Sequence, residues 1–582
     1  MKHMVIDGIS CEFENERNVL EVAKKHHIDI PNLCYCESLS IYGGCRLCVV
    51  ENERGAVEAA CSMQPKDGLV IKTNTARLRK HRQMILELLL AGHRAECTTC
   101  EKSGKCKLQT YARRYNVTNI RFANEYCKLP IDESSPSIVR DPSKCILCGK
   151  CVRMCSEIQN IHAVDFAERG IETYISCGFD NRLADTKCVG CGQCAAVCPT
   201  GAIVVKNEIS KLWAAIYDST KKVAVQVAPA VRVGIGEEFG MSASQPVMGK
   251  IVTALKMLGA DYVFDTSLTA DLTIMEESAE FMNKLKTGAK LPMFTSCCPG
   301  WIKHVENMHP HLMPQVSTCG SPMEMFGAIL RQHYTDDELY SVAIMPCTAK
   351  KAEAARPELV KDGERLIDLV LTTQELAKMI KEAGIDFANL PDTEPDDPFA
   401  EYTGAGVIFG VTGGVMEAAL RTVYHALTGE EYGKIDFTEV RGFDGIREAS
   451  LDINGTHINV AVAHGMKNAR VLLDEIRAGK SKYQFIEVMG CPGGCIAGGG
   501  QPYVKPCFLP NEDIDILDTY REKRAQALYS EDERQTIRQS HNNKQIQQLY
   551  SEYLGEPNSH RAHELLHTHY HAREGFNDLK KK

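Results

Sequence analysis

The sequence predicts a multidomain protein of mixed α+β and α/β class with a helical tail at its carboxyl end. Three observations carry this prediction. With 582 residues, the chain exceeds what one hydrophobic core usually supports. Up to about residue 208, cysteines recur in short motifs among strand-like segments. From about residue 221, short apolar runs alternate with helical stretches.

Composition limits the class of partner. The chain is 44% hydrophobic and 25% charged, as soluble globular proteins are. Its formal net charge of -9 argues against nucleic acid, because phosphate binding needs a basic face. We expect a cytoplasmic protein without a membrane partner, because "MKHMVIDGISCEF" lacks a signal-peptide core and no stretch approaches about 18 apolar residues. In such a chain, 26 cysteines grouped as Cys-x-x-Cys indicate bound metal rather than disulfides.

The first predicted domain, residues 1–78, holds four cysteines with one wide gap, one Cys-x-x-Cys pair and a distant fourth member. They are Cys34, Cys45, Cys48 and Cys61. The pair Gly43 and Gly44 lets the backbone wrap closely around a buried group. This spacing favours a ferredoxin-like domain with a 2Fe-2S cluster, and a tetrahedral zinc site is the alternative. Cys36 is interpreted as a spare thiol.

The second predicted domain spans residues 79–120. The pattern "HRQMILELLLAG" predicts a helix that ends at Gly92. Four candidate ligands follow it, namely His93, Cys97, Cys100 and Cys106. Alone they could bind zinc, but their place between two iron-sulfur motifs favours a 4Fe-4S cluster with one imidazole ligand.

The third predicted domain, residues 136–208, carries two C-x2-C-x2-C-x3-C runs, which are typical of two-cluster ferredoxins. In such runs the fourth cysteine binds the other cluster. We therefore assign one 4Fe-4S cluster to Cys145, Cys148, Cys151 and Cys198, and a second to Cys188, Cys191, Cys194 and Cys155. The domain is expected to relay electrons.

Residues 209–510 are predicted to form an α/β domain. Its buried, largely parallel strands are expected at "KVAVQVAP", "DYVFDT", "PMFTSCC", "SVAIMPC", "GVIFGVT", "INVAVAHG" and "QFIEVMGC". Three of these runs stop at a cysteine, and ligands gather beyond the carboxyl ends of such strands. We therefore expect Cys298, Cys347, Cys491 and Cys495 to converge. Inert core thiols are the alternative, although "CPGGCIAGGG" would make a poor core.

Three of these stretches carry a resemblance. "FTSCCPGW", "MPCTAKK" and "EVMGCPGGCIAGGGQP" resemble the signature motifs of iron-only, or FeFe, hydrogenases, and the upstream cysteine groups resemble the accessory domains of larger members. The resemblance covers nearly the whole chain through about residue 510. It implies ferredoxin-like iron-sulfur domains followed by an α/β FeFe-hydrogenase catalytic domain and a helical C-terminal tail over residues 511–582.

The resemblance also implies the cofactors. Cys298, Cys347, Cys491 and Cys495 match the ligands of the 4Fe-4S part of an H-cluster. Cys495 also matches the bridge to a two-iron subcluster with carbon monoxide, cyanide and an azadithiolate. Contacts to this subcluster are implied for Lys350, Met345, Met489, Pro229 and Ala230. The expected set is one 2Fe-2S cluster, three accessory 4Fe-4S clusters and the H-cluster. Met323 and Ala230 stand where some members carry glutamine and serine.

Two neighbouring thiols receive different roles. Adjacent side chains of an extended segment point to opposite faces, so Cys297 and Cys298 are not expected to be equivalent ligands. The resemblance makes Cys297 the proton-transfer thiol and continues the route through Glu280, Ser317 and Glu277, in that order. The two glutamates are three residues apart and share a helix face, which suits a relay of carboxyl groups. Alone, such a pair is more typical of a solvated helix face.

The remaining cysteines and histidines receive no ligand role. Cys319 is expected close to the site, whereas Cys11, Cys127, Cys177 and Cys507 are interpreted as core or surface thiols. The tail contains His563, His567, His569 and His571. No acid or cysteine frames these histidines in a ligand pattern, so the tail is interpreted as structural.

The implied function is reversible oxidation of hydrogen to protons and electrons, with H2 and protons as substrates. The amino-terminal region resembles catalytic subunits of electron-bifurcating complexes, so ferredoxin, flavin- and NAD-binding subunits and small iron-sulfur subunits are the expected partners. The chain needs such a subunit for NAD because "GVTGG" is no nucleotide-binding fingerprint. The alternatives are a stand-alone ferredoxin-dependent enzyme, an electron-transfer subunit, an iron-sulfur assembly factor and a hydrogen sensor.

Overall fold

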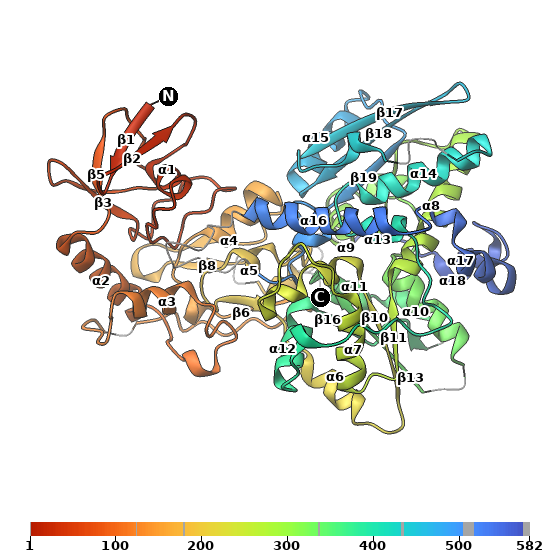
Figure 1. Cartoon of the computed structure of the whole chain (residues 1–582), viewed down its shortest axis with the longest axis horizontal. Coiled ribbons are helices and arrows are strands. Elements are labelled where there is room, and N and C mark those ends of the chain that lie inside the picture. The colour runs from red at the N-terminus through yellow and green to blue at the C-terminus, as the bar shows by residue number, and fades with distance from the viewer. Residues whose placement is uncertain are drawn as a thin grey trace. The chain divides into compact units, whose positions relative to one another are not determined.

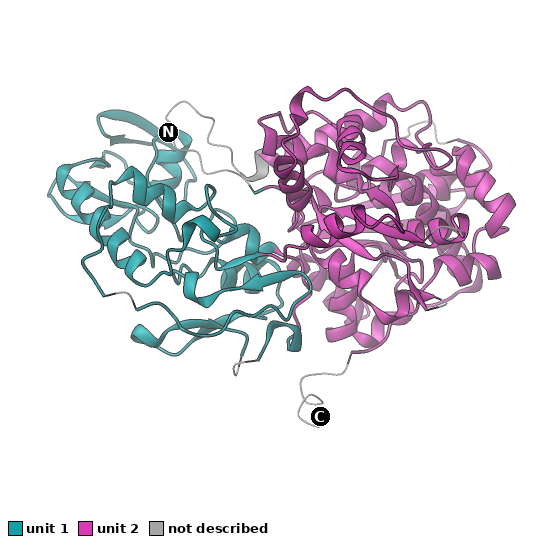
Figure 2. Cartoon of the chain, turned by 90° about the horizontal axis from the view of Figure 1, so that it is seen from below, with its two compact units in different colours: residues 1–186, 193–204, 503–517 teal, residues 187–192, 205–502, 518–582 magenta. Residues whose placement is uncertain are grey.

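The computed structural model describes residues 2–123, 125–178, 181–335, 338–361, 363–431, 436–503 and 517–573 (Figure 1). The chain forms two compact units (Figure 2). Unit 1 comprises residues 1–186, 193–204 and 503–517, and unit 2 comprises residues 187–192, 205–502 and 518–582. Among the described residues, no helix has the length and apolarity to cross a membrane. Cys507 and the predicted start of the tail at residue 511 lie outside the described residues.

Unit 1 begins with a five-stranded sheet in the order β2-β1-β5-β3-β4 (Figure 1). The strands are β1 (Lys2–Ile6), β2 (Ile9–Phe13), β3 (Val49–Asn52), β4 (Val57–Ala59) and β5 (Val70–Lys72). Strand β1 runs parallel to β5, and the other pairs are antiparallel. Helix α1 (Val19–Lys25) begins at Asn18, whose side chain accepts a hydrogen bond from the Glu21 backbone. Its apolar face buries Val19 and Val22 in the core of this sheet.

The rest of unit 1 consists of short elements between the cysteine groups. Helix α2 (Ala76–Ala91) ends at Gly92, as predicted. The remaining helices are α3 (Lys107–Arg114), α4 (Lys150–Arg153) and α5 (Gln193–Val197). Two small strand pairs complete it, β6 (Ile138–Arg140) with β9 (Ile203–Val205) and β7 (Asp165–Ala167) with β8 (Tyr174–Ser176).

Unit 2 contains two four-stranded sheets. The first has the order β11-β10-β13-β16, is parallel throughout, and consists of β10 (Lys222–Val227), β11 (Tyr262–Asp265), β13 (Leu339–Met345) and β16 (Leu369–Thr372). The second has the order β12-β19-β18-β17 and consists of β12 (Met293–Phe294), β17 (Ile446–Ile453), β18 (Thr456–His464) and β19 (Phe485–Met489). Only β17 runs antiparallel there. The parallel strands are almost fully buried, which explains their continuous apolar sequences.

Helices surround these sheets. The first seven in chain order are α6 (Ile209–Ile216), α7 (Met248–Leu258), α8 (Ser267–Thr287), α9 (Pro299–Met308), α10 (Pro322–His333), α11 (Ala349–Ala354) and α12 (Thr373–Glu382). The next are α13 (Gly404–Ile408), α14 (Gly414–Thr428), α15 (Met466–Arg477), α16 (Leu517–Arg534), α17 (Lys544–Leu549) and α18 (His560–Leu566). The predicted α/β architecture and helical carboxy-terminal region are confirmed.

One predicted strand is wrong. The first three residues of the run "GVIFGVT" belong to helix α13 instead, and the other four form a turn. A short, fully buried apolar run has no periodicity that separates strand from helix. Tertiary contacts favour the helix here. Asp271 of α8 accepts hydrogen bonds from the Thr403 backbone N–H and hydroxyl. A Cβ atom at Gly406 would collide with the Ser267 carbonyl oxygen, so only glycine lets the two helices approach this closely.

The carboxy-terminal helices are an integral part of unit 2. Arg421 of α14 donates hydrogen bonds of 2.9 and 3.0 Å to Asp532 and one of 2.8 Å to Glu417. All three side chains are almost completely buried. Asp271 also accepts hydrogen bonds from Ser540 and Asn543. Buried polar groups are therefore paired across this junction, and Asp532 and Glu417 have further partners in Arg538 and Arg441.

We predict that Arg421→Met destabilises unit 2 by about 1.5–3 kcal/mol, because the buried carboxylates of Asp532 and Glu417 lose the hydrogen bonds of their shared cation and keep only the less buried Arg538 and Arg441 as partners. Chemical unfolding of the cluster-free chain, followed by tryptophan fluorescence, measures this, since both tryptophans, Trp213 and Trp301, lie in unit 2. Arg470→Met is the control: its contact with Asp474 is half-exposed, and we expect a change below about 1 kcal/mol. Equal effects of the two changes would contradict the prediction.

Candidate iron-sulfur sites and active site

Four cysteines of the first domain meet in unit 1. Cys34, Cys45, Cys48 and Cys61 are all buried. Hydrogen bonds from the thiols of Cys45 and Cys61 lower the pKa of Cys34 to about 2. Cys48 is likewise hydrogen-bonded to Cys61. Sulfurs this close suit a shared metal group. Cys36 instead contacts the Ser38 hydroxyl at 3.4 Å and is not among these hydrogen-bonded thiols.

The histidine of the second group is oriented by a backbone carbonyl. His93 Nδ1 lies 3.0 Å from the Lys144 carbonyl oxygen. Burial lowers the pKa of His93, so its ring is neutral near pH 7, and a proton on Nδ1 leaves the Nε2 lone pair available for a metal. One small pocket is lined by all four members of the set, His93, Cys97, Cys100 and Cys106. A Cβ atom at Gly201 would lie 2.6 Å from Cys100 Sγ, so glycine makes room for this sulfur.

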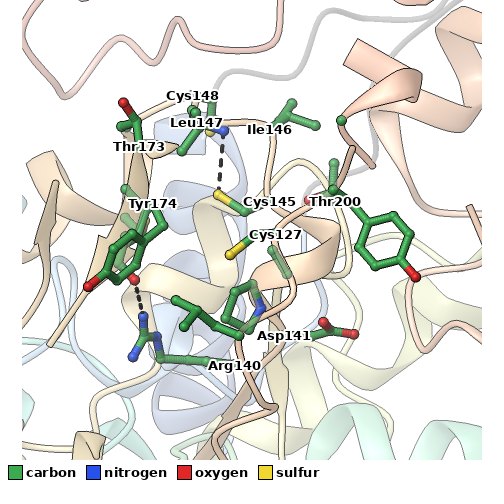
Figure 3. Close-up of a pocket in the computed structure, with 18 of the residues that line it drawn as sticks. Cys127, Arg140, Asp141, Cys145, Ile146, Leu147, Cys148, Thr173, Tyr174 and Thr200 are labelled. Atoms are coloured by element: carbon green, nitrogen blue, oxygen red, sulfur yellow. Dashed lines mark hydrogen bonds between the residues drawn. The ribbon is translucent and has the colours of Figure 1, made fainter. Parts of the chain in front are cut away.

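A pocket of unit 1 lies at the third cysteine group (Figure 3). Its volume is about 850 Å³, and Cys145, Cys148, Cys151 and Cys198 all line it. The Leu147 N–H donates to Cys145 Sγ at 3.4 Å, as backbone amides do to cluster sulfurs. Cys127, which has no motif, also lines this pocket, with its sulfur toward that of Cys145 (Figure 3). Cys188 and Cys191 belong to unit 2, so the second ferredoxin set stays a prediction from spacing.

In unit 2, three strands end at the cysteines of the fourth group. Strand β12 is followed by Cys298, β13 by Cys347 and β19 by Cys491, and Cys495 begins a short 3-10 turn. The Gly490 N–H donates to Cys298 Sγ at 3.3 Å. Burial, aided by the charge of Cys298, raises the pKa of Cys347 to about 12, and both of these thiols act in the same direction on Cys495. The structure thus brings the four thiols together.

The surroundings of these thiols fit a large anionic metal cluster. A Cβ atom at Gly494 would lie 2.6 Å from the Thr412 nitrogen and 3.0 Å from Met489 Sδ, so the backbone closes tightly here. Lys350 is buried, and its Nζ lies 2.6 Å from Glu353 Oε2 without the angles of a hydrogen bond. Its N–H groups are therefore available to an anionic ligand such as cyanide.

The other residues expected around the subcluster are also buried. Met345 and Met489 close strands β13 and β19, and Pro229 and Ala230 follow β10 in a 3-10 turn. The Ala230 carbonyl accepts a hydrogen bond of 2.6 Å from Gln501, which the sequence analysis did not single out. Met323 is buried in α10. Buried methionines of this kind would exclude water from a group bound beside them.

The two glutamates on α8 have different neighbours. Among neighbouring charges, that of Glu277 contributes most to raising the pKa of Cys297, after burial. Glu280 instead accepts a hydrogen bond of 2.8 Å from Ser317 and pairs with Lys284 Nζ at 2.8 Å. The geometry therefore supports the order Cys297, Glu277, Ser317, Glu280. The three-residue spacing of the two glutamates placed both carboxyl groups on one helix face. It did not indicate which of them is more deeply buried.

Glu277 is the deeper carboxyl group. It is fully buried, and the Ser296 N–H and hydroxyl donate to its Oε1 at 2.9 Å. Burial raises the pKa of Glu277 to about 7 despite these hydrogen bonds, and the charge of Glu280 acts in the same direction. Ser317 also lies within hydrogen-bonding reach of this carboxyl group. A group that is half-protonated near neutral pH can both accept and release a proton there.

Comparison with known proteins now identifies the family. The sequence model described as "Iron only hydrogenase large subunit, C-terminal domain" matches residues 221–499. A relative from Solidesulfovibrio fructosivorans, "NADP-reducing hydrogenase subunit HndD", is 45% identical over 99% of both chains. "Iron hydrogenase 1" of Clostridium pasteurianum is 39% identical over 98% of this chain and 100% of its own. This chain belongs to the FeFe hydrogenases.

Solved structures of FeFe hydrogenases agree with this. A variant of HydA1 from Chlamydomonas reinhardtii has a TM-score of 0.56 and 41% identity over 63% of this chain and 99% of its own. Upstream, models described as "2Fe-2S iron-sulfur cluster binding domain", "NADH-ubiquinone oxidoreductase-G iron-sulfur binding region" and "4Fe-4S dicluster domain" match residues 3–76, 82–121 and 144–202. This FeFe hydrogenase therefore has amino-terminal iron-sulfur domains. The predicted domain boundaries stay predictions.

The carboxy-terminal tail of this FeFe hydrogenase matches a family model and contacts the neighbourhood of Ser317. The model "Iron hydrogenase small subunit" matches residues 518–573. His567 in this region contacts Thr318 Oγ1 at 2.8 Å, next to the Ser317 of the relay. Sequence reasoning missed this contact because its partners are separated by 249 residues. The cluster of histidines in "HELLHTHYH" was the only local signal.

We predict that an infrared carboxylic-acid band from Glu277 is present below pH 7 and disappears above it, with its midpoint near the raised pKa of about 7. The sign follows from burial, which favours the neutral acid. Infrared pH titration of wild type against Glu277→Gln isolates the band. Glu280→Gln should keep the band and lower its midpoint, because the charge of Glu280 helps to raise the pKa of Glu277. A midpoint near the ordinary glutamate value would contradict the prediction.

Proposed function

We propose that this FeFe hydrogenase subunit oxidises hydrogen reversibly to two protons and two electrons. One observation carries the proposal: the four thiols at the ends of β12, β13 and β19 lie at the inner end of a buried route of proton-carrying groups. Without hydrogen turnover, a buried acid, a hydroxyl and a second acid leading away from the thiols would have no evident use.

The residues would hold five groups. A 2Fe-2S cluster is proposed for the set of Cys34, and 4Fe-4S clusters for the set of His93 and the two ferredoxin sets. The H-cluster is proposed for Cys298, Cys347, Cys491 and Cys495. When bound, its two-iron subcluster supplies the metal centre and the amine base at which the H–H bond breaks. Lys350 would hold a cyanide, while Met345 and Met489 would exclude water.

We propose that the chain's own groups carry the proton outward. Burial raises the pKa of Cys297, which keeps the thiol protonated between transfers. Its proton passes to Glu277, whose carboxyl group exchanges protons near neutral pH. The Ser317 hydroxyl links Glu277 to Glu280, which it contacts at 2.8 Å. The accessory clusters, when bound to the cysteine sets of the amino-terminal domains, would accept the electrons.

The proposed electron acceptors are ferredoxin and, through flavin-bearing partner subunits, NAD(P), coupled by electron bifurcation. The support is the 45% identity over 99% of its length to a chain named as an NADP-reducing hydrogenase subunit. A partner is needed because the sequence carries no dinucleotide fingerprint. A stand-alone ferredoxin-dependent enzyme is the second candidate, favoured by the equally complete match to "Iron hydrogenase 1".

The first test is hydrogen-dependent reduction of a viologen dye by the chain alone, purified anaerobically after co-expression with the maturation enzymes. We predict turnover, and a loss of at least about 100-fold in Cys297→Ala, in the range of general acid–base contributions. Cys36→Ala is the control, since this thiol lies outside every proposed ligand set. A chain that shows the carbon monoxide and cyanide infrared bands yet never turns over would favour the sensor.

The second test concerns the acceptor. We predict that the chain alone does not reduce NAD or NADP with hydrogen, and that reduction begins when flavin-bearing subunits from the same source are added. Ferredoxin should increase the rate if the two acceptors are coupled. Rapid ferredoxin reduction by the chain alone, with no effect of added subunits on either acceptor, would favour the stand-alone enzyme.

A further inference from the structure

A second polar cluster lies on the outer side of Glu280 and comes from the carboxy-terminal segment. His567 directly follows α18, and its backbone forms an antiparallel bridge with Cys319. Its side chain is only 2% exposed. Nδ1 lies 2.8 Å from Thr318 Oγ1, and Nε2 lies 3.1 Å from Glu276 Oε2. Both ring nitrogens therefore have a partner, which fixes the orientation of the imidazole.

This imidazole lies close to the relay. One of its nitrogens, a carboxylate oxygen of Glu280 and Cys319 Sγ are all within 4.8 Å of one another. Thr318 joins the two groups, because its N–H donates to Glu280 Oε2 at 3.1 Å while its hydroxyl contacts the His567 ring. A separation of this size is one that a single water molecule bridges.

On its other side, His567 reaches the surface of unit 2. Its ring stacks on that of His563, with centroids 3.8 Å apart, and His563 is exposed to solvent. Glu276 is fully buried, and it accepts hydrogen bonds from the Tyr550 hydroxyl at 2.6 Å and the Asn558 N–H at 2.8 Å. A carboxylate fixed in this way orients the imidazole.

We propose that His567 is a proton-transfer residue that connects Glu280 to solvent through His563. The carboxy-terminal segment then supplies the outer end of the relay. The Glu280 carboxyl group releases a proton to a ring nitrogen of His567 and becomes a carboxylate, and the imidazolium releases a proton to His563 or to water and returns to the neutral ring. No oxidant or reductant is involved. The proposal rests on the proposed hydrogen turnover.

Lys284 is the alternative candidate for accepting a proton from Glu280. Its ammonium pairs with Glu280 Oε1 at 2.8 Å and is 15% exposed. A protonated amine has no lone pair with which to accept a proton, so it serves as a counter-charge to the carboxylate. A neutral imidazole has both a donor and an acceptor nitrogen, which is what a relay requires.

The experiment compares His567→Gln with His571→Gln, which changes an exposed histidine four residues along the same segment. Glutamine keeps hydrogen-bonding capacity toward Thr318 and Glu276 but does not carry protons. In dye-linked hydrogen oxidation by the loaded chain, we expect His567→Gln to lower turnover by about 10-fold to 100-fold, to increase the solvent isotope effect, and to recover activity with added imidazole. His571→Gln should behave as wild type, and both should keep the infrared bands of the cofactor.

Several results would overturn the proposal. Unchanged turnover in His567→Gln together with a loss in Lys284→Ala would assign the exit to Lys284. A loss in His567→Gln that imidazole does not restore, with an unchanged isotope effect, would show a structural role only.

A second measurement does not depend on turnover. The titratable groups near the ring are Glu276, Glu280, Cys319, Tyr550, His563 and Lys284. In the chain labelled with 15N-histidine, Glu280→Gln should shift the titration of His567 and leave that of His571 unchanged. An unmoved His567 titration would overturn the link to Glu280. If wild type never oxidises hydrogen but this shift is seen, the proposed function fails while the contact stands.

Discussion

The burial of four thiols at one edge of unit 2 is the constraint on which the rest of the site depends. Burial raises the pKa values of Cys298, Cys347, Cys491 and Cys495, so without a metal these groups are neutral thiols in an apolar environment. Coordination to iron requires the thiolate forms, whose charges are stable at this depth only when a cationic metal compensates them. The tight backbone at Gly494 and the buried ammonium of Lys350 are compatible with the proposed binding of a bulky, partly anionic group at these thiols.

The same low dielectric explains the chemistry of the relay. A chain of ionised carboxylates would be costly at the depth of Glu277, whereas a carboxyl group with a pKa near 7 exists in both forms at little cost. Hydroxyl groups such as Ser317 carry a proton without any net charge. Charge is tolerated only further out, where Glu280 has Lys284 as its partner. The order of the proposed proton-carrying groups, from Glu277 through Ser317 to Glu280, thus runs from the apolar interior towards solvent.

The sequence predicted those parts of the molecule whose signal is local. Apolar runs that stop at a cysteine predicted β12, β13 and β19. The ligand sets that cysteine spacing indicates stay predictions. What failed depended on neighbours far along the chain. The start of the run "GVIFGVT" is helical where Gly406 packs against Ser267 and the preceding Thr403 binds Asp271, both more than 130 residues earlier in the chain. The order of Glu277 and Glu280 depends on which of them faces the segment after β12, and helical spacing contains no such information.

Helix α8 contacts both the carboxy-terminal tail and the residues of the proposed proton route. Successive residues of a helix are rotated by about 100°, so the adjacent Glu276 and Glu277 face different partners. Glu277 faces Ser296 and the thiols, whereas Glu276 binds Tyr550, Asn558 and His567 of the carboxy-terminal segment. One turn further on, Glu280 lies within reach of both sides. Without the tail, Glu276 would lose the partners that compensate its burial, and Glu280 would lose the cover beside the relay. The region similar to a hydrogenase small subunit is therefore needed both for the stability of α8 and for the environment of the proton route.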